Sequence, residues 1–481
     1  MRRLIVLALA ALLAAFPALA KPVPARLTHE QAVRELNLLE RAFTELHPGL
    51  YRYQTEADLK AAFARARAEV AEGADAATMY LLATRLAASV RCGHTFTNPL
   101  NQRHDIQAML AALPALPFRV RLLQERLLVT ASADPAVRAN DEILSIDGRS
   151  IRGLIGELMP YLRADGSNDG KRLDEINTVD EGGALDSLLP LLHPPVDGRY
   201  MLRVRAADGV MRTASVAGLA VSEREARLAG AGTAAASSDW HFEIDGDVAR
   251  LTLPTFSFWR SDFDWAGYLK QRFQTMDKQH VARLVIDLRQ NEGGDSAIGQ
   301  ALLGYLIDAP YEVPPGRLQS AYERVPYDLA RYLDTWDFSF FDRTGQVVRQ
   351  DAHRWGPKEA PAPEQVLPSQ PRFRGKVVAL VGPRMSSAGF LLARDLKATG
   401  AAVLVGETTG GNRRGLNGGQ LAWLTLPYSG VAVDIPLIAT VHDGEPDAGI
   451  DPDVEIRTSV EDVLAGRDPV RDAALLQLQV P

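Results

Sequence analysis

Two adjacent serines lie between an apolar run and a helix-like stretch in "VVALVGPRMSSAGFLLARDL", residues 377–396. A Ser at such a position commonly caps a helix, because its oxygen accepts a hydrogen bond from an unpaired N–H of the first turn. The position also suits a nucleophile, since the same N–H groups can stabilise an oxyanion. The order strand, turn, Ser, helix is typical of a nucleophile elbow, although G-x-S-x-G is absent. This segment alone leaves both interpretations open.

Two further segments carry groups that a hydrolytic site needs. "LVIDLRQNEGGDS", residues 284–296, ends an apolar run in a Gly-Gly turn whose backbone N–H groups can face an anion. "CGHT", residues 92–95, supplies a His after a helical stretch, although a lone His is more often structural and the chain has nine. A hydroxyl, an anion-binding turn and an imidazole in one chain are stronger evidence for nucleophilic catalysis than any one of these groups alone.

With two later motifs, these segments resemble the tail-specific, or carboxyl-terminal processing, serine peptidases, a family that includes tricorn-like enzymes. The matching pieces occur in the family's order and cover most of the mature chain: Gly93–Thr95, Asp287–Gly294, Ser386–Gly389, Val405–Gly411 and Gly449–Ile456. "NDEILSIDGRSI" resembles the PDZ-type module of that family. The resemblance implies an α/β fold with a crotonase/ClpP-like core, a PDZ-like domain and an N-terminal helical bundle.

The resemblance also assigns the nucleophile and the oxyanion hole. Ser387, directly before Ala388, matches the nucleophile, and Ser386 does not. The backbone N–H groups of Gly293 and Ala388 match the oxyanion hole, which is chemically sensible because two donors stabilise a tetrahedral oxyanion. Phe390 stands where many members carry Glu.

The base separates this chain from one branch of the family. Asn412 stands where the Ser–Lys dyad enzymes have Lys, and an amide cannot take a proton. The tricorn-like branch uses a His and a late acid, and His94 matches that His. The acid is expected just before "GIDPD", where Glu445 is preferred and Asp447 is the alternative; a solvated turn is the competing interpretation of both.

Other reactive side chains are expected to be structural. The single cysteine, Cys92, excludes an internal disulfide and is expected to be a small buried residue near the site. His442, near Glu445, is interpreted as a surface-turn residue rather than an alternative base. There is no Cys/His cluster at zinc spacing and no EF-hand-like loop, so neither a metal nor a cofactor is expected.

Composition changes along the chain predict its organisation. Residues 1–20 have the basic end, apolar core and small-residue cleavage site of a signal peptide. Further divisions are expected, namely a helical region at 28–95, a PDZ-like region at 115–222, a linker at 228–239 and a catalytic core at 240–460. A Pro-rich, aromatic insert at 310–374 suggests a lid or substrate-binding flap, with a surface excursion as the alternative. Its aromatic cluster is expected to be shielded from water, over the cleft or against the PDZ-like region; its members are Tyr327, Tyr332, Trp336, Phe338 and Phe340.

These observations predict an exported serine endopeptidase, periplasmic or extracellular, that acts on a peptide or protein substrate. A formal charge of −7 disfavours nucleic acid as a partner, and no later apolar run reaches membrane-spanning length. One alternative is a catalytically silent protein on the same fold that binds an apolar ligand or a peptide. Another is a hydrolase or acyl-transfer enzyme for small esters or thioesters. Oligomeric state leaves no signature in this sequence.

Overall fold

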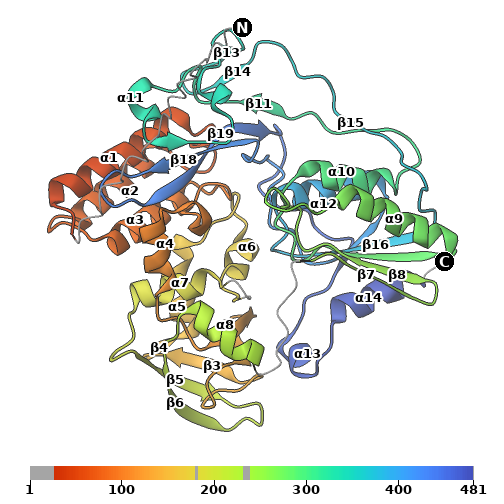
Figure 1. The fold of residues 1–481 in the computed structure, drawn as a ribbon, viewed down its shortest axis with the longest axis horizontal. Coiled ribbons are helices and arrows are strands. Elements are labelled where there is room, and N and C mark those ends of the chain that lie inside the picture. The colour runs from red at the N-terminus through yellow and green to blue at the C-terminus, as the bar shows by residue number, and fades with distance from the viewer. Residues whose placement is uncertain (1–25, 179–181, 231–238, 480–481) are drawn as a thin grey trace, which may run out of the picture.

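The computed structural model describes residues 26–178, 182–230 and 239–479. The predicted signal peptide, residues 1–20, and most of the predicted linker lie outside the described residues. The chain is a mixed α/β protein with N-terminal helices, a middle region built on one sheet, and a core built on another (Figure 1). Within the described ranges, no helix is long and apolar enough to cross a membrane.

Three helices begin the described chain: α1 (His29–Leu46), α2 (Glu56–Glu69) and α3 (Ala76–Ser89). Thr28 and Thr55 each form a capping box, accepting from a backbone N–H three residues on. Leu36, Leu39 and Phe43 lie on the buried face of α1, as their helical spacing predicts. The short elements η1 (Pro99–Asn101) and α4 (His104–Ala111) lead to the middle region.

The middle region, residues 118–230, is one antiparallel sheet with helices packed against it. Its strands are β1 (Phe118–Leu123), β2 (Arg126–Ser132), β3 (Glu142–Ile146), β4 (Arg149–Ser150), β5 (Arg199–Arg205) and β6 (Met211–Ala217), in the spatial order β1-β2-β3-β5-β6 with β4 beside β3. The helices are α5 (Ile151–Leu158), η2 (Met159–Tyr161), α6 (Asp169–Asp174), α7 (Ala184–Leu192) and α8 (Val221–Gly230). Helix α8 therefore extends into the predicted linker by three residues.

The core is a six-stranded sheet in the order β20-β17-β16-β9-β8-β7. All neighbouring strands are parallel except β7 and β8, as expected for strands that alternate with helices. The strands are β7 (His241–Asp245), β8 (Val248–Thr252), β9 (Arg283–Asp287), β16 (Lys376–Val381), β17 (Val403–Gly406) and β20 (Val454–Glu455). One face is covered by α9 (Trp265–Lys278), α10 (Ser296–Gly304) and α12 (Ser387–Thr399), and the other by α14 (Pro469–Gln477), which follows α13 (Val460–Leu464) (Figure 1).

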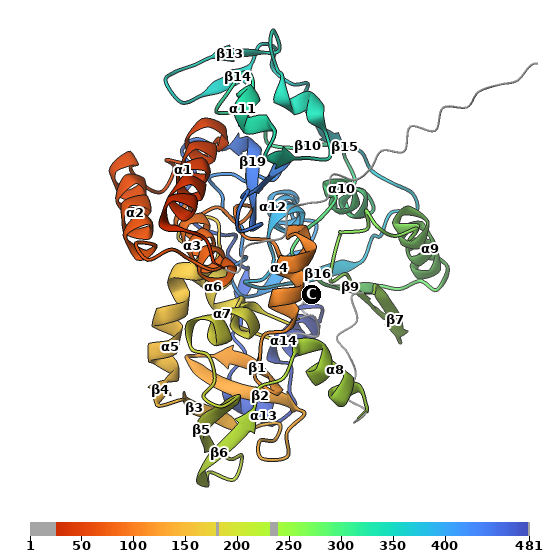
Figure 2. The same ribbon diagram turned by 60° about the vertical axis from the view of Figure 1, so that its left-hand side comes forward.

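The insert packs on the N-terminal helices. Its strands β11 (Arg317–Gln319) and β12 (Leu333–Asp334) flank β18 (Gln420–Thr425) and β19 (Ala432–Val441) in a four-stranded sheet. Buried residues of this sheet and of α1–α3 form one apolar cluster, and Figure 2 shows the insert above α1 and β19, away from the middle region. The remaining elements of the insert are β10 (Tyr311–Glu312), α11 (Tyr327–Ala330), η3 (Phe338–Phe341), β13 (Val347–Arg349), β14 (Trp355–Pro357) and β15 (Gln365–Val366).

The expectation that the aromatic cluster of the insert is shielded from water is wrong for three members. Tyr327 is 95% exposed, and Trp336 and Phe338 are more than half exposed. The apolar contacts of the insert come instead from Tyr322, Val325 and other residues that face α1 and the sheet. Burial of these residues is enough to fix the insert, so the exposed rings need no cover.

Candidate active site

Ser387 begins helix α12, six residues after the end of β16. Its backbone has φ = 50°, in the left-handed region that a non-glycine residue seldom adopts. Such a conformation costs about 1–3 kcal/mol and is characteristic of functional turns. The turn therefore holds the Ser387 hydroxyl at the carboxyl end of a buried parallel strand, as the elbow-like order in the sequence predicts.

The neighbouring Ser386 has a different environment. Its hydroxyl donates to the Glu292 carbonyl at 3.4 Å, and its backbone N–H donates to the Asn291 carbonyl. Ser386 is the N-cap of α12, but its side chain makes no capping hydrogen bond. Of the two serines, Ser387 is the one whose hydroxyl faces an imidazole.

That imidazole is His94, which lies 293 residues earlier in the chain. Its Nε2 is 3.2 Å from Ser387 Oγ. The loop that carries it is anchored by Thr95, whose hydroxyl is 2.9 Å from Nε2 of the buried His47. Gly418 lies directly against the ring, because a Cβ there would be 2.5 Å from His94 Nε2.

The electrostatic surroundings keep His94 neutral. Burial lowers the pKa of the imidazole, the Asp165 carboxylate opposes that shift, and Arg163 adds to it. The net direction is downward, so the ring is uncharged at neutral pH and can accept a proton. Among the described residues, His94 Nδ1 is buried and has no hydrogen-bond partner.

Gly293 and Ala388 meet beside Ser387. A Cβ on Gly293 would lie 2.7 Å from Ala388 N and 2.7 Å from Ser387 Cβ, so only glycine fits this approach, and φ is 97°. Ala388 N–H belongs to the first turn of α12, where N–H groups lack helical partners. Gly293 N–H donates to Asn291 Oδ1 at 2.8 Å, so it can serve an oxyanion only by sharing or exchanging that bond.

The two acids favoured by the sequence do not contact His94. Glu445 forms an ion pair with Arg413 at 2.7 Å. Asp447 accepts from Asn412 Nδ2 at 2.7 Å and from the backbone and side chain of Ser167.

Asp165, from the middle region, is the carboxylate that lies near the ring instead. It is 4% exposed and its Oδ1 accepts from Gly93 N–H at 2.8 Å. One of its oxygens, a ring nitrogen of His94 and Cys92 Sγ all lie within 4.8 Å of one another. Sequence reasoning missed Asp165, because the segment "RADGSNDG" has the composition of an ordinary polar turn.

Residues 247–456 match the model of Peptidase family S41. The chain is a serine peptidase of family S41. The matched range contains Ser387 and Gly293 and excludes His94, which lies in the helical N-terminal part. The family assignment deduced from the motifs is thereby confirmed.

Solved structures show that the likeness of fold extends over nearly the whole peptidase. Mature CPAF complexed with lactacystin is 16% identical, with a TM-score of 0.63, over 94% of this chain and 99% of that one. Mature CPAF on its own is 15% identical, with a TM-score of 0.62, over 94% and 98%. No curated protein sequence matches the chain. At these identities the comparison shows only that the two proteins share a fold, and the shared fold includes the N-terminal helices.

Neither Asn412 nor the nearby lysine of the peptidase has the properties of a base. Asn412 is fully buried and its amide donates to Asp447 and to the Asp165 carbonyl. Lys171 is also buried; burial lowers its pKa, but Glu175 and Glu292 outweigh this and leave the pKa raised. The ammonium therefore stays protonated, whereas the neutral imidazole of His94 lies next to Ser387.

Cys92, His94 and Asp165 are the one group in the described ranges that has the composition of a metal site. The Cys92 thiol is 2% exposed, and burial raises its pKa to about 11. Its sulfur accepts from Asn417 Nδ2 at 3.2 Å. A protonated thiol is a poor ligand and a poor nucleophile, so Cys92 acts here as a buried packing residue.

Proposed function

We propose that this peptidase is an exported endopeptidase in which Ser387 is the nucleophile and His94 the general base. The observation that carries the proposal is the 3.2 Å contact between His94 Nε2 and Ser387 Oγ. The lowered pKa of His94 supports it, because only a neutral imidazole can take the proton. Export rests on the signal-like residues 1–20.

In this mechanism Ser387 Oγ attacks the peptide carbonyl carbon while its proton passes to His94 Nε2. The carbonyl oxygen becomes an oxyanion that the Ala388 N–H can stabilise, with Gly293 N–H as the second donor once it exchanges its bond to Asn291. The imidazolium then gives its proton to the leaving amine, and the acyl-enzyme forms. Water attacks the ester through the same base and releases the second product.

Asp165 is the acid that we assign to His94 in place of Glu445. An imidazolium forms during the reaction, and a buried carboxylate nearby stabilises it. The Asp165 carboxylate offsets part of the lowering of the His94 pKa that burial causes, whereas Glu445 is paired with Arg413. Catalytic hydrogen bonds are often long without substrate, so a small shift of either side chain is enough to join Asp165 to the free Nδ1.

The test uses the two adjacent serines as a matched pair. The full chain, Ser387→Ala and Ser386→Ala are treated with a fluorophosphonate probe and assayed on unfolded casein. We expect Ser387→Ala to lose labelling and about a thousandfold or more of its hydrolysis, and Ser386→Ala to keep both. Labelling that survives in Ser387→Ala and vanishes in Ser386→Ala would show that the motif is out of register. A wild-type chain that hydrolyses short esters but no peptide would assign the site to another hydrolase class.

A further inference from the structure

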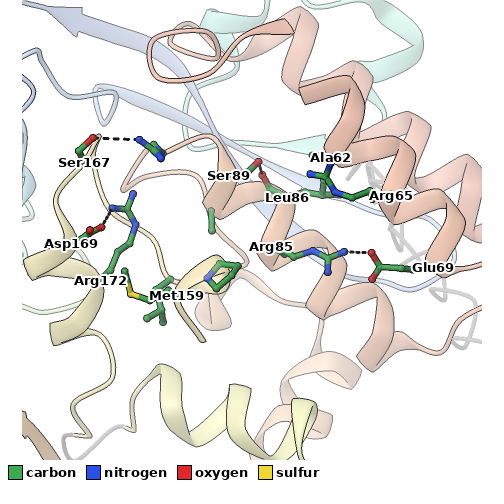
Figure 3. Close-up of a pocket in the computed structure, with 14 residues that line it drawn as sticks. Ala62, Arg65, Glu69, Arg85, Leu86, Ser89, Met159, Ser167, Asp169 and Arg172 are labelled. Atoms are coloured by element: carbon green, nitrogen blue, oxygen red, sulfur yellow. Dashed lines mark hydrogen bonds and ion pairs between the residues drawn. The ribbon is translucent and has the colours of Figure 1, made fainter. Parts of the chain in front are cut away.

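A cavity of about 530 Å³ lies between helices α2 and α3 and the segment 159–172 of the middle region. Figure 3 shows Arg65 and Arg85 reaching it from the helices, and Met159 and Arg172 from the facing segment. We call it the arginine groove. Its floor is apolar, with side chains from Leu86, Met159 and Leu162.

The charged residues of the groove are unbalanced. Its arginines are Arg65, Arg85, Arg91 and Arg172, and its acids are Glu69 and Asp169. Both acids are already paired, Glu69 with Arg85 at 2.6 Å and Asp169 with Arg172 at 2.8 Å.

The two remaining arginines have no such partner. Within the part of the chain that the structure describes, neither Arg65 nor Arg91 has a carboxylate in ion-pair distance. The side chain of Arg91 only reaches the Ser167 hydroxyl, at 3.4 Å. Two uncompensated cations give the groove a local positive charge in a chain whose formal charge is −7.

We propose that the arginine groove binds an acidic peptide segment, part of the substrate but remote from the bond that is cleaved. Carboxylates of the segment pair with Arg65 and Arg91, because guanidinium groups match carboxylates in two-point geometry. Apolar side chains of the segment contact the floor. A small inorganic anion would use the arginines but leave the floor exposed, so the charge and the apolar lining together favour a peptide.

The groove is joined to the active site by short backbone contacts. Arg91 O accepts from Gly166 N–H at 2.9 Å, and Arg172 donates to the Gly166 carbonyl at 2.7 Å. Gly166 follows Asp165, which binds Gly93 next to His94. A segment in the groove therefore contacts both loops that place the imidazole and its carboxylate, and this coupling rests on the proposed function.

Binding is measured first, separately from catalysis. The full chain carrying Ser387→Ala is titrated into a fluorescein-labelled eight-residue peptide of Asp, Glu and Leu, and anisotropy is followed at low ionic strength. A peptide with Asn and Gln in place of the acids is the control. We expect the acidic peptide to bind, the neutral one to bind at least about tenfold more weakly, and added salt to weaken the difference.

Variants locate the site. Arg65→Glu should weaken binding about tenfold or more, and Arg91→Gln should weaken it in the same direction. Lys60→Glu changes the net charge equally on the same helix but lies outside the groove, so it should stay within about twofold. Far-ultraviolet circular dichroism checks the fold, and Arg65→Ala replaces Arg65→Glu if the latter unfolds. Unchanged binding in both arginine variants, or equal binding of the two peptides, would refute the groove.

The catalytic arm uses the chain with Ser387 intact. One scissile sequence is offered with and without the acidic segment, and we expect Arg65→Glu to reduce the preference for the acidic substrate about tenfold through KM. If neither substrate is hydrolysed while the acidic peptide still binds, the proposed function fails and the groove stands. If both are hydrolysed with no preference, the groove plays no part in substrate choice and the proposal is wrong.

Discussion

The proposed nucleophile and the proposed base reach the same site by different means. Ser387 lies in a strand–turn–helix unit of the core, and Gly293, its close neighbour, follows the adjacent strand β9. His94 lies outside the core, in a loop held by His47 from the N-terminal helices, by Asp165 from the middle region and by Gly418 before β18. Local geometry of one sheet thus sets the nucleophile, whereas contacts between distant segments set the base. A change to these contacts can therefore alter activity without unfolding the core.

Two glycine substitutions test this difference directly. Gly293→Ala would place a methyl group 2.7 Å from Ala388 N and would force a side chain into φ = 97°, so the backbone must move. We expect kcat/KM to fall at least about 100-fold, with a lower unfolding midpoint. Gly418→Ala meets the His94 ring at 2.5 Å, and a ring can rotate away. It should lose comparable activity but little stability.

Steady-state kinetics and thermal unfolding measure both effects. Gly156→Ala is the control, because a Cβ there meets nothing within 4 Å. Normal turnover in Gly418→Ala would mean that the position of the His94 ring is not critical, and the contrast between the two sides would disappear.

The choice of acid gives a smaller effect. In Asp165→Asn the side chain can still accept from Gly93 N–H, but the negative charge is lost. Because Asp165 raises the pKa of His94, its removal should move the acid limb of the kcat/KM profile to lower pH. We expect kcat to fall about tenfold or more with little change in KM.

Glu445→Gln is the matched variant for this measurement. It removes the charge that pairs with Arg413 and should leave the acid limb in place. The reverse pattern, a large kcat loss in Glu445→Gln and none in Asp165→Asn, would restore the acid that the sequence favours.

The smallest effect concerns the stability of the base side. Burial lowers the pKa of His47 to about 3, while a His in the unfolded chain titrates near 6.5. Between these values the unfolded state binds the extra proton, so the free energy of unfolding falls as the pH is lowered. From pH 6.5 to pH 5 the loss is about 2 kcal/mol, and the lowered pKa of His94 adds to it in the same direction.

Urea unfolding at several pH values measures this slope. His47→Gln should be less stable at pH 7 because it loses the contacts to Thr95 and Gly49, but its slope should be shallower by up to one proton. An equal slope in both proteins would mean that His47 is not held neutral by the fold.

Local patterns determined much of this protein. The capping residues Thr28 and Thr55 define helix starts through contacts within four residues, and the apolar run before Ser387 fixes the strand and the turn. Such features depend on neighbours in the chain, so composition and spacing reveal them. The motifs also singled out Ser387 and His94, and the structure brings the two side chains to 3.2 Å of each other.

Only the tertiary structure decided which groups surround that pair. Asp165 rather than Glu445 lies near His94 because the segment 162–175 docks onto the loop at 91–95, and no local pattern encodes that contact. No sequence pattern showed that Gly293 N–H donates to Asn291, or that the insert packs on the N-terminal helices. Electrostatic partners are chosen by whichever segments meet in space, and that depends on the summed burial of many residues rather than on any one of them.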